Sequence, residues 1–364
     1  MSDIFNKRVV IKLGTGVLTK GIGELDLDRM RSICAQVAAA IKNGWSPIIV
    51  SSGAVGLGMG RLGLKKRPKK ISQVQMCAGV GQGILIQTWS ELFESCGLCV
   101  AQILLTRDDL DLRPRHKAMR DLLDELLERG IVPIINENDC ISAAGLYMKF
   151  GDNDVLSSLV AAFSKSARLI ILSTAPGLID MNGSGKIIKT VKKIDDSVKS
   201  QASGTTSATA VGGMVTKLKA AEIATSSGCD VYIASGAREN AITDILADKN
   251  PGTHFVAGAV NANSKKRWLA YFGRTTGRIL VDAGAANAVR NKGSSLLHAG
   301  VREVEGDFDK GEFVEIADAA TGELVARGLS EESSARIRDS LGAHDKTKCG
   351  HKDVVVHRDN LVLM

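Results

Sequence analysis

Short apolar runs alternate with longer segments of helical periodicity over the first 235 residues. The apolar runs cover 8–13, 47–50, 98–105, 131–135, 168–172 and 230–234. Between them, apolar residues recur at spacings of three and four over 26–43, 72–95, 115–129, 155–165 and 214–226. Such runs indicate buried strands, and such periodicity indicates amphipathic helices. The alternation predicts an α/β fold, a three-layer sandwich whose central, mostly parallel sheet carries helices on both faces.

The pattern changes near residue 275. Short alternating segments at 278–282, 312–316, 323–327 and 353–357 are separated by turn residues. Several strands of this kind, close together, indicate a small β-rich unit. The sequence therefore predicts a large α/β domain over 1–260, a connection over 261–276 and a β-rich domain over 277–364.

Composition excludes several classes of protein. Of the 364 residues, 44% are apolar and 24% are charged, which is typical of globular domains and not of disordered chains. No apolar run approaches the roughly 18 residues that a membrane helix needs. The first residues lack the apolar segment of a secretory signal, and the seven cysteines show no pairing pattern. We therefore expect a cytoplasmic protein with reduced thiols and no membrane partner.

The net charge of +7 raises the question of nucleic-acid binding, and its distribution argues against it. Residues 277–364 hold 12 Lys and Arg against 15 Asp and Glu, a net −3, so the remaining residues carry +10. Five of these charges lie in the basic run 65–70. A domain that is net acidic is a poor reader of a phosphate backbone, although a local basic face stays possible. Nucleic acid is therefore not an expected partner.

Two lysines lie where parallel sheets bind ligands, at the carboxyl ends of strands and the starts of helices. Lys12 ends the first strand beside Gly14 and Gly16, and glycines allow backbone N–H groups to approach phosphate oxygens. Their spacing is not that of a Walker A loop. Lys217 follows Gly212-Gly213 in the first turn of a helix, where its charge opposes the helix dipole unless an anion binds there. Together they indicate a phosphate site.

Amide, hydroxyl and carboxylate groups follow two other strands and precede one helix. Ser51–Ala54 is a loop after the second strand, and the Gly56/Gly58/Gly60 series that follows it lacks the later acidic residue of a dinucleotide site. Asn136–Asp139 follows another strand, and Asp152–Asp154 comes just before a helix. Each residue alone could be a turn former or a helix cap. Several such clusters at one edge of the sheet indicate a binding site.

In this order and spacing the motifs resemble the glutamate 5-kinase family. The segments that carry the resemblance are Val-Ile-Lys12-Leu-Gly-Thr, Val50-Ser-Ser52-Gly53-Ala, Ile-Ile-Asn136-Glu-Asn-Asp139, Gly151-Asp-Asn-Asp154, Gly-Gly213-Met-Val-Thr-Lys217 and Lys266-Arg-Trp268. The segment from Gly277 resembles that family's PUA domain, through Gly293-Ser-Ser-Leu-Leu297 and Val356-His-Arg-Asp359 among others. The resemblance covers essentially the whole chain.

The resemblance implies an amino-acid-kinase fold and ATP-dependent phosphorylation of the γ-carboxylate of L-glutamate. The product, L-glutamyl 5-phosphate, enters proline biosynthesis. It further implies in-line phosphoryl transfer with Mg²⁺, in which Lys12 and Lys217 offset the phosphate charge and Asp154 orients them. No protein residue is expected to ligate the metal. A carboxylate nucleophile is already ionised at neutral pH, so no general base is expected.

By motif position, the resemblance implies two further sets of residues. The glutamate-binding set is Ser52, Gly53, Asn136, Asp139, Asp152 and Asn153. The ATP-binding set is Lys12, Gly14, Ser173, Thr174, Val211, Gly212, Gly213, Met214, Val215, Thr216 and Lys217. Two segments depart from the family pattern: 173–179 lacks the usual Asp and Tyr, and Ala210-Val211 replaces Gly-Thr. Both departures concern nucleotide contacts rather than the reaction.

Other interpretations remain open at this point. The same fold supports acyl kinases that act on aspartate or N-acetylglutamate, and a PUA domain can bind RNA. The acidic and amide clusters favour free glutamate. A homo-oligomer is expected, although the sequence does not fix its size, and the resemblance implies feedback inhibition by proline at or near the glutamate site.

Overall fold

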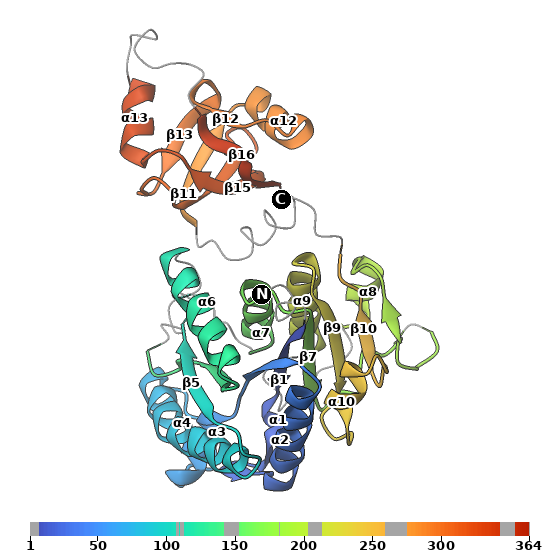
Figure 1. Cartoon of the computed structure of the whole chain (residues 1–364). Helices are drawn as coiled ribbons and strands as arrows, with labels where there is room; N and C mark the ends of the chain where they lie inside the picture. Colours follow the sequence, from blue (N-terminus) through green and yellow to red (C-terminus); the bar gives the residue numbers. More distant parts are fainter. Residues whose placement is uncertain are drawn as a thin grey trace. The chain divides into compact units, whose positions relative to one another are not determined.

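The computed structural model describes residues 7–106, 109, 113–141, 153–181, 183–202, 213–258, 275–342 and 354–363. The chain divides into two compact units, Met1–Ala259 and Val260–Met364 (Figure 1). Of the predicted connection, 261–276, residues 261–274 lie outside the described residues. The first described strand of the second unit begins at Thr275.

The first unit is built on an eight-stranded sheet in the order β5-β6-β4-β1-β7-β9-β10-β8. Its strands are β1 (Arg8–Leu13), β4 (Ser46–Val50), β5 (Val100–Leu105), β6 (Val132–Glu137), β7 (Arg168–Ser173), β8 (Thr190–Val191), β9 (Asp230–Ser235) and β10 (Thr253–Phe255). Every neighbouring pair is parallel except β9 and β10. The predicted mostly parallel sheet is confirmed, and six of its strands coincide with the apolar runs within two residues. A small hairpin, β2 (Thr19–Gly21) with β3 (Glu24–Leu25), lies outside this sheet.

Helices cover both faces of the sheet. They are α1 (Thr15–Leu18), α2 (Leu27–Lys42), α3 (Ala54–Arg61), α4 (Ile71–Glu94), α6 (Arg113–Glu128), α7 (Asn153–Phe163), α8 (Asp196–Ser200), α9 (Met214–Ser226) and α10 (Ala241–Leu246). Side chains alternate along β1: Val9, Ile11 and Leu13 join the buried core that includes α2 and α4. The intervening Lys12 points to the other face, where α7 packs against β1 and α9.

The predicted loop 51–54 ends one residue earlier than expected, because Ala54 begins helix α3, which the Gly56/Gly58/Gly60 series did not indicate. Helices α3 and α4 pack so closely that a Cβ atom on Gly58 would lie 1.8 Å from the Cys77 carbonyl oxygen. A Cβ on Gly81 would lie 1.8 Å from the Ala54 carbonyl oxygen. The low helix propensity of glycine is therefore offset by backbone contact between the two helices.

The second unit is a six-stranded sheet in the order β12-β16-β15-β14-β11-β13. Its strands are β11 (Thr275–Val281), β12 (Leu296–Leu297), β13 (Val301–Glu305), β14 (Phe313–Asp318), β15 (Leu324–Ser330) and β16 (Val354–Leu363). Two helices, α12 (Ala283–Lys292) and α13 (Ser334–Gly342), and a short 3₁₀ turn (His298–Gly300) complete the described part. A core of its own, including Ile279, Ile316 and Val355, confirms a separate β-rich domain.

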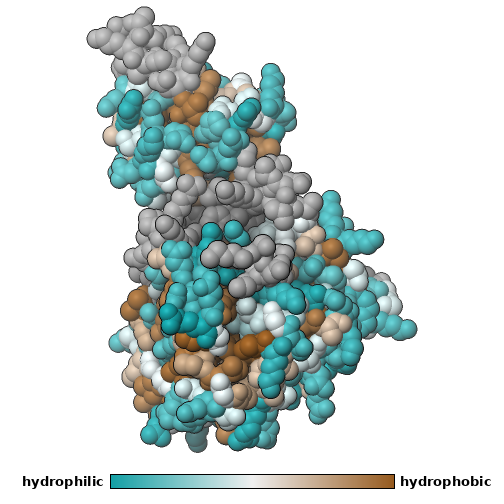
Figure 2. All heavy atoms as spheres, viewed as in Figure 1, coloured by the Kyte–Doolittle hydropathy of each residue, from teal (hydrophilic) through white to brown (hydrophobic). Residues whose placement is uncertain are grey.

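Apolar side chains lie among polar ones on the viewed surface of the first unit (Figure 2). Exposed apolar residues of the α3–α4 pair are Leu62, Ile71, Met76 and Val80. Within the described ranges, no helix is long and apolar enough to cross a membrane.

Candidate active site

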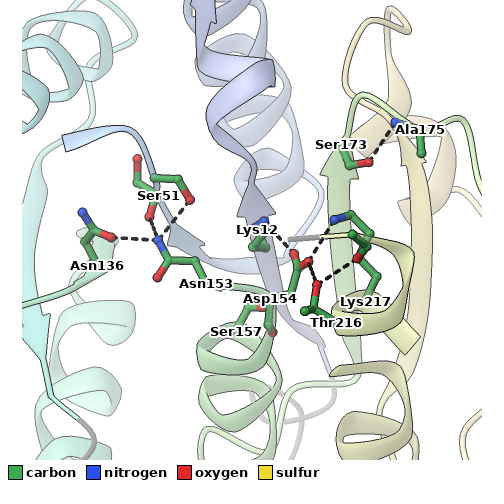
Figure 3. A network of polar contacts seen from close by, with 12 residues as sticks. Lys12, Ser51, Asn136, Asn153, Asp154, Ser157, Ser173, Ala175, Thr216 and Lys217 are labelled. Atoms are coloured by element: carbon green, nitrogen blue, oxygen red, sulfur yellow. Dashed lines mark hydrogen bonds and ion pairs between the residues drawn. The ribbon is translucent and has the colours of Figure 1, made fainter. Parts of the chain in front are cut away.

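Two lysines and one aspartate meet where β1, α7 and α9 converge (Figure 3). Lys12 Nζ lies 2.6 Å from Asp154 Oδ1, and Lys217 Nζ lies 2.9 Å from Asp154 Oδ2. Their side chains are 4%, 7% and 0% exposed for Lys12, Lys217 and Asp154 respectively. Along the chain, Lys12 and Asp154 are 142 positions apart, and Asp154 and Lys217 are 63 positions apart. The fold brings these three residues together.

The electrostatics of this cluster favour an ionised carboxylate. Burial by itself opposes ionisation of Asp154, but the ammonium groups of Lys12 and Lys217 outweigh it and lower the pKa of the Asp154 carboxyl. Two cations around one anion leave a net positive charge in a water-poor place. Such a cluster can bind a polyphosphate and stabilise charge that develops on a transferred phosphoryl group.

The start of α9 adds a hydroxyl to this side of the site. Thr216 Oγ1 lies 3.2 Å from Asp154 Oδ2 and 2.8 Å from the Gly213 carbonyl oxygen. Met214 is buried, whereas Val215 is 61% exposed. The predicted ATP residues Val211 and Gly212 lie outside the described residues.

The loops after β1 and β7 lie side by side. The Gly14 N–H donates to the Leu172 carbonyl oxygen at 3.1 Å, and a Cβ atom on Gly16 would lie 2.9 Å from Thr174 Cγ2. The Ser173 hydroxyl accepts a hydrogen bond from the Ala175 N–H at 2.9 Å (Figure 3). The predicted ATP residues Gly14, Ser173 and Thr174 are therefore neighbours of the loop that follows Lys12.

A second polar network lies on the β4–β6 side of α7. Asn153 Nδ2 lies 2.7 Å from the Ser51 carbonyl oxygen, 3.0 Å from Ser52 Oγ and 2.9 Å from Asn136 Oδ1. Gly53 then begins α3 with φ of +105°, a left-handed conformation that strains any residue with a Cβ. Ser52, Gly53, Asn136 and Asn153, four of the six predicted glutamate residues, are thus brought together.

Asp139 lies in the turn that follows β6, and Asp152 is outside the described residues. Burial raises the pKa of the Asp139 carboxyl above its ordinary value, and the Arg67 guanidinium offsets this only in part. At least one charge of the basic run 65–70, that of Arg67, therefore interacts electrostatically with the Asp139 carboxyl group. The Cys140 thiol beside it packs against α4, 3.9 Å from the Gln75 carbonyl oxygen.

Sequence reasoning missed two members of the second network. Gln82 of α4 accepts a hydrogen bond from Asn136 Nδ2 at 2.8 Å, and the Ser51 main chain accepts from Asn153. A main-chain acceptor leaves no signature in the sequence. The sequence signal for Gln82 was its neighbour Gly81, because the alternating glycines within 56–60 and within 79–83 indicate two closely packed helices.

Metal and disulfide sites are absent from the part of the chain that the structure describes. No group of three or more His, Cys, Asp or Glu residues there could hold a metal ion. Six cysteines of that part are free thiols, including both members of the Cys96-x-x-Cys99 pair.

Comparison with known proteins places the chain in a class. Residues 7–235 match the model of the amino acid kinase family, and residues 277–347 match that of the PUA domain. A carbamate kinase from Giardia shares the fold, with a TM-score of 0.50 and 18% identity over 70% of this chain and 99% of that one. Fold, site and family match together define an amino acid kinase that carries a PUA domain.

Curated relatives narrow the class further. The glutamate 5-kinase of Shewanella pealeana is 41% identical over the full length of both chains. The glutamate 5-kinase of Moorella thermoacetica is 41% identical, with 98% of this chain and 96% of the relative covered. That of Aliivibrio salmonicida is 40% identical over 99% of each. The chain belongs to the glutamate 5-kinase family.

Proposed function

We propose that this protein transfers the γ-phosphoryl group of ATP to the γ-carboxylate of L-glutamate, forming L-glutamyl 5-phosphate in the first step of proline biosynthesis. The observation that carries the proposal is the Asp154 carboxylate holding two buried lysines, in a chain of the glutamate 5-kinase family. The cluster supplies positive charge where a phosphoryl group would move between two anions.

On the phosphate side, Lys12 and Lys217 contact phosphoryl oxygens and stabilise the charge that builds up in the transition state. Asp154 keeps both ammonium groups in place, so little reorganisation accompanies the reaction. The loops that contain Gly14, Ser173-Thr174 and 211–217 contact the rest of ATP. The exposed Val215 side chain at the start of α9 suits contact with the nucleotide.

On the amino-acid side, the γ-carboxylate and α-carboxylate of glutamate need hydrogen-bond donors, and its ammonium group needs acceptors. Ser52 and the backbone N–H groups at Gly53 and the start of α3 are donors. Asp139 and Asp152 are the carboxylates proposed to bind the ammonium group, with Asn136 and Asn153 ordering the site between them.

No general base is required in this reaction. The glutamate carboxylate has an ordinary pKa near ~4.3 and is ionised at neutral pH, so it attacks without losing a proton. The main barrier is repulsion between two anions, which the lysines reduce. In-line transfer needs the attacking carboxylate to lie opposite the leaving phosphate, and the two networks, which meet at the adjacent residues Asn153 and Asp154, support such a placement.

Mg²⁺ belongs in this proposal as part of the nucleotide substrate. Both oxygens of Asp154 contact lysines, and the described residues offer no other carboxylate cluster for a metal. The phosphates of ATP would hold the ion, since Mg²⁺ at such sites keeps several waters and binds substrate phosphates. There it would neutralise phosphate charge alongside the lysines.

The test is an acyl-phosphate assay with ATP, in which hydroxylamine traps the product as a hydroxamate. We expect product with glutamate and little with aspartate or N-acetylglutamate. Lys217→Ala should abolish most of the activity. Lys219→Ala, an exposed lysine two residues further along α9, is the matched control and should retain it. Activity with N-acetylglutamate but not glutamate would refute the substrate, and an active Lys217→Ala would remove Lys217 from the mechanism.

The proposal extends to regulation and assembly. Proline, an amino acid that lacks the γ-carboxylate, is proposed to compete at or near the glutamate site, which would raise the KM for glutamate without changing that for ATP. A homo-oligomer in the cytoplasm is proposed as the working form, and light scattering after size-exclusion chromatography measures its mass.

A further inference from the structure

We propose that Gln82 is a positioning residue for the amino-acid side of the site. By accepting from the Asn136 NH₂ group, it holds Asn136 in the orientation that the Glu137 N–H sets and, through Asn153, sets Ser52 to donate its hydroxyl proton to a substrate carboxylate. The inference rests on the proposed function, because it assigns Ser52 to substrate binding. Gln82 belongs to α4 and lies 54 residues from its partner Asn136.

The direction of the hydrogen bonds is set by two main-chain groups that cannot reverse their roles. The Glu137 N–H donates to Asn136 Oδ1 at 2.9 Å, so this atom is the acceptor and Asn136 Nδ2 is the atom that faces Gln82. The Ser51 carbonyl oxygen accepts from Asn153 Nδ2 at 2.7 Å, so Asn153 presents its NH₂ group to Asn136 and Ser52. Each amide therefore has one allowed orientation.

Gln82 supplies the acceptor for the NH₂ group of Asn136. The Asn136 side chain is buried, with 2% of the residue exposed, and an N–H without an acceptor is costly there. If Asn136 turned to find another acceptor, it would lose its contacts to Glu137 and Asn153. The two hydrogens of the Asn153 NH₂ group are shared among the Ser51 carbonyl oxygen, Asn136 Oδ1 and Ser52 Oγ, and because an amide nitrogen does not accept, the Ser52 proton is left to be donated elsewhere. That proton is what a substrate carboxylate needs.

The position of Gln82 is itself held by packing. Its neighbour Gly81 contacts the Ala54 carbonyl oxygen so closely that no Cβ fits between them. One and two turns further along α4, Leu85 and Trp89 are fully buried, and Trp89 Nε1 donates to Ser51 Oγ at 3.0 Å. Helix α4 therefore contacts both ends of the segment Ser51–Ala54, and these contacts hold Gln82 in a fixed position relative to Ser52.

Steady-state kinetics of Gln82→Met, with glutamate and ATP varied separately, test the proposal. Met keeps the volume and removes the acceptor. We expect the KM for glutamate to rise about tenfold, the order of effect when a buried N–H loses its partner, with kcat and the KM for ATP within about twofold. Gln87→Met is the control, because Gln87 is exposed on the same helix and bonds only to Glu91 in the described structure.

Gln82→Glu separates positioning from direct contact. Its carboxylate still accepts from Asn136, so its KM for glutamate should return to within about threefold of wild type. In a Ser52→Ala background, Gln82→Met should add about twofold or less, because the route through Ser52 is already lost. If Gln82→Met folds poorly, Gln82→Ala replaces it, since it adds no bulk at a half-buried helix position.

Three outcomes would overturn the proposal: an unchanged KM for glutamate in Gln82→Met, an equal rise in the KM for ATP, or a Gln82→Glu enzyme as impaired as Gln82→Met. The proposed function can fail separately. If the wild-type enzyme phosphorylates another amino acid, the same comparison is made with that substrate.

Discussion

Replacement of Asp154 by asparagine separates the charge of this residue from its shape. Asn keeps one carbonyl oxygen, so it can accept from one of the two lysines. Its NH₂ group would face the other ammonium group, donor against donor. In the native protein the two contacts are 2.6 Å and 2.9 Å and none of the three side chains is more than 7% exposed. Asp154→Asn therefore leaves two buried cations without an anion.

The magnitude follows from these distances. At an effective dielectric constant of about 20, each contact contributes a gross attraction of about 6 kcal/mol, and desolvation of the three ions offsets most of it. Removal of one partner leaves the desolvation cost without the attraction, which destabilises a protein by about 3–5 kcal/mol. For a unit of this size that lowers the Tm by about 10 °C. We expect kcat to fall about 100-fold or more, because the lysines lose their fixed positions.

Thermal unfolding and the hydroxamate assay measure both effects. Glu222→Gln is the control for a lost carboxylate, because Glu222 pairs with Lys199 at the surface, where such pairs contribute less than about 1 kcal/mol. ADP should raise the Tm of Asp154→Asn at least as much as that of the wild type, since its phosphates supply the missing negative charge. An Asp154→Asn protein within about 1 kcal/mol of wild-type stability, or with kcat reduced less than about tenfold, would refute the reasoning.

Three further predictions concern other parts of the site. Burial raises the pKa of Asp139, so the folded protein favours the neutral carboxyl group and loses that stability as pH rises through the raised pKa. Asp139→Asn should therefore raise the Tm at pH 7 and not at pH 3. Arg67 lowers the same pKa, so Arg67→Gln should move the acid limb of the kcat/KM profile for glutamate to higher pH. Gly81→Ala should cost about 2 kcal/mol or more in urea unfolding, because its Cβ would meet Ala54, whereas Gly83→Ala, with open space around it, should stabilise by about 0.5–1 kcal/mol.

The strands and long helices were predictable because each carries its own periodicity. The strand Arg8–Leu13 and the helix Met214–Ser226 lie where the pattern placed them. Helix α3 was not predictable in this way, since four of its eight residues are Ala or Gly and three glycines disfavour a helix in isolation. It forms because α4 packs on it, which is a tertiary effect that no local window contains.

In the candidate site too, local sequence could place some residues, whereas their contacts depend on the fold. Lys12 and Lys217 could be placed from local sequence, each beside glycines at the end of a strand or the start of a helix. That one carboxylate contacts both could not be derived from spacing, because it depends on α7 lying between β1 and α9. Gln82 shows the same limit more strongly, because the glycine beside it indicates a close helix contact but nothing in the sequence pairs Gln82 with Asn136, 54 residues away.

Adjacent residues at the start of α7 face the two halves of the proposed reaction. Asn153 contacts Ser51, Ser52 and Asn136, whereas Asp154 contacts Lys12, Thr216 and Lys217 (Figure 3). Consecutive helical residues project about 100° apart, so the two side chains point to different sides of the helix start. In the proposed reaction, one rigid helix start therefore sets the separation between the amino-acid carboxylate and the phosphate that it attacks. A change that shifts α7 would alter both subsites at once, whereas Gln82→Met should disturb the amino-acid side alone.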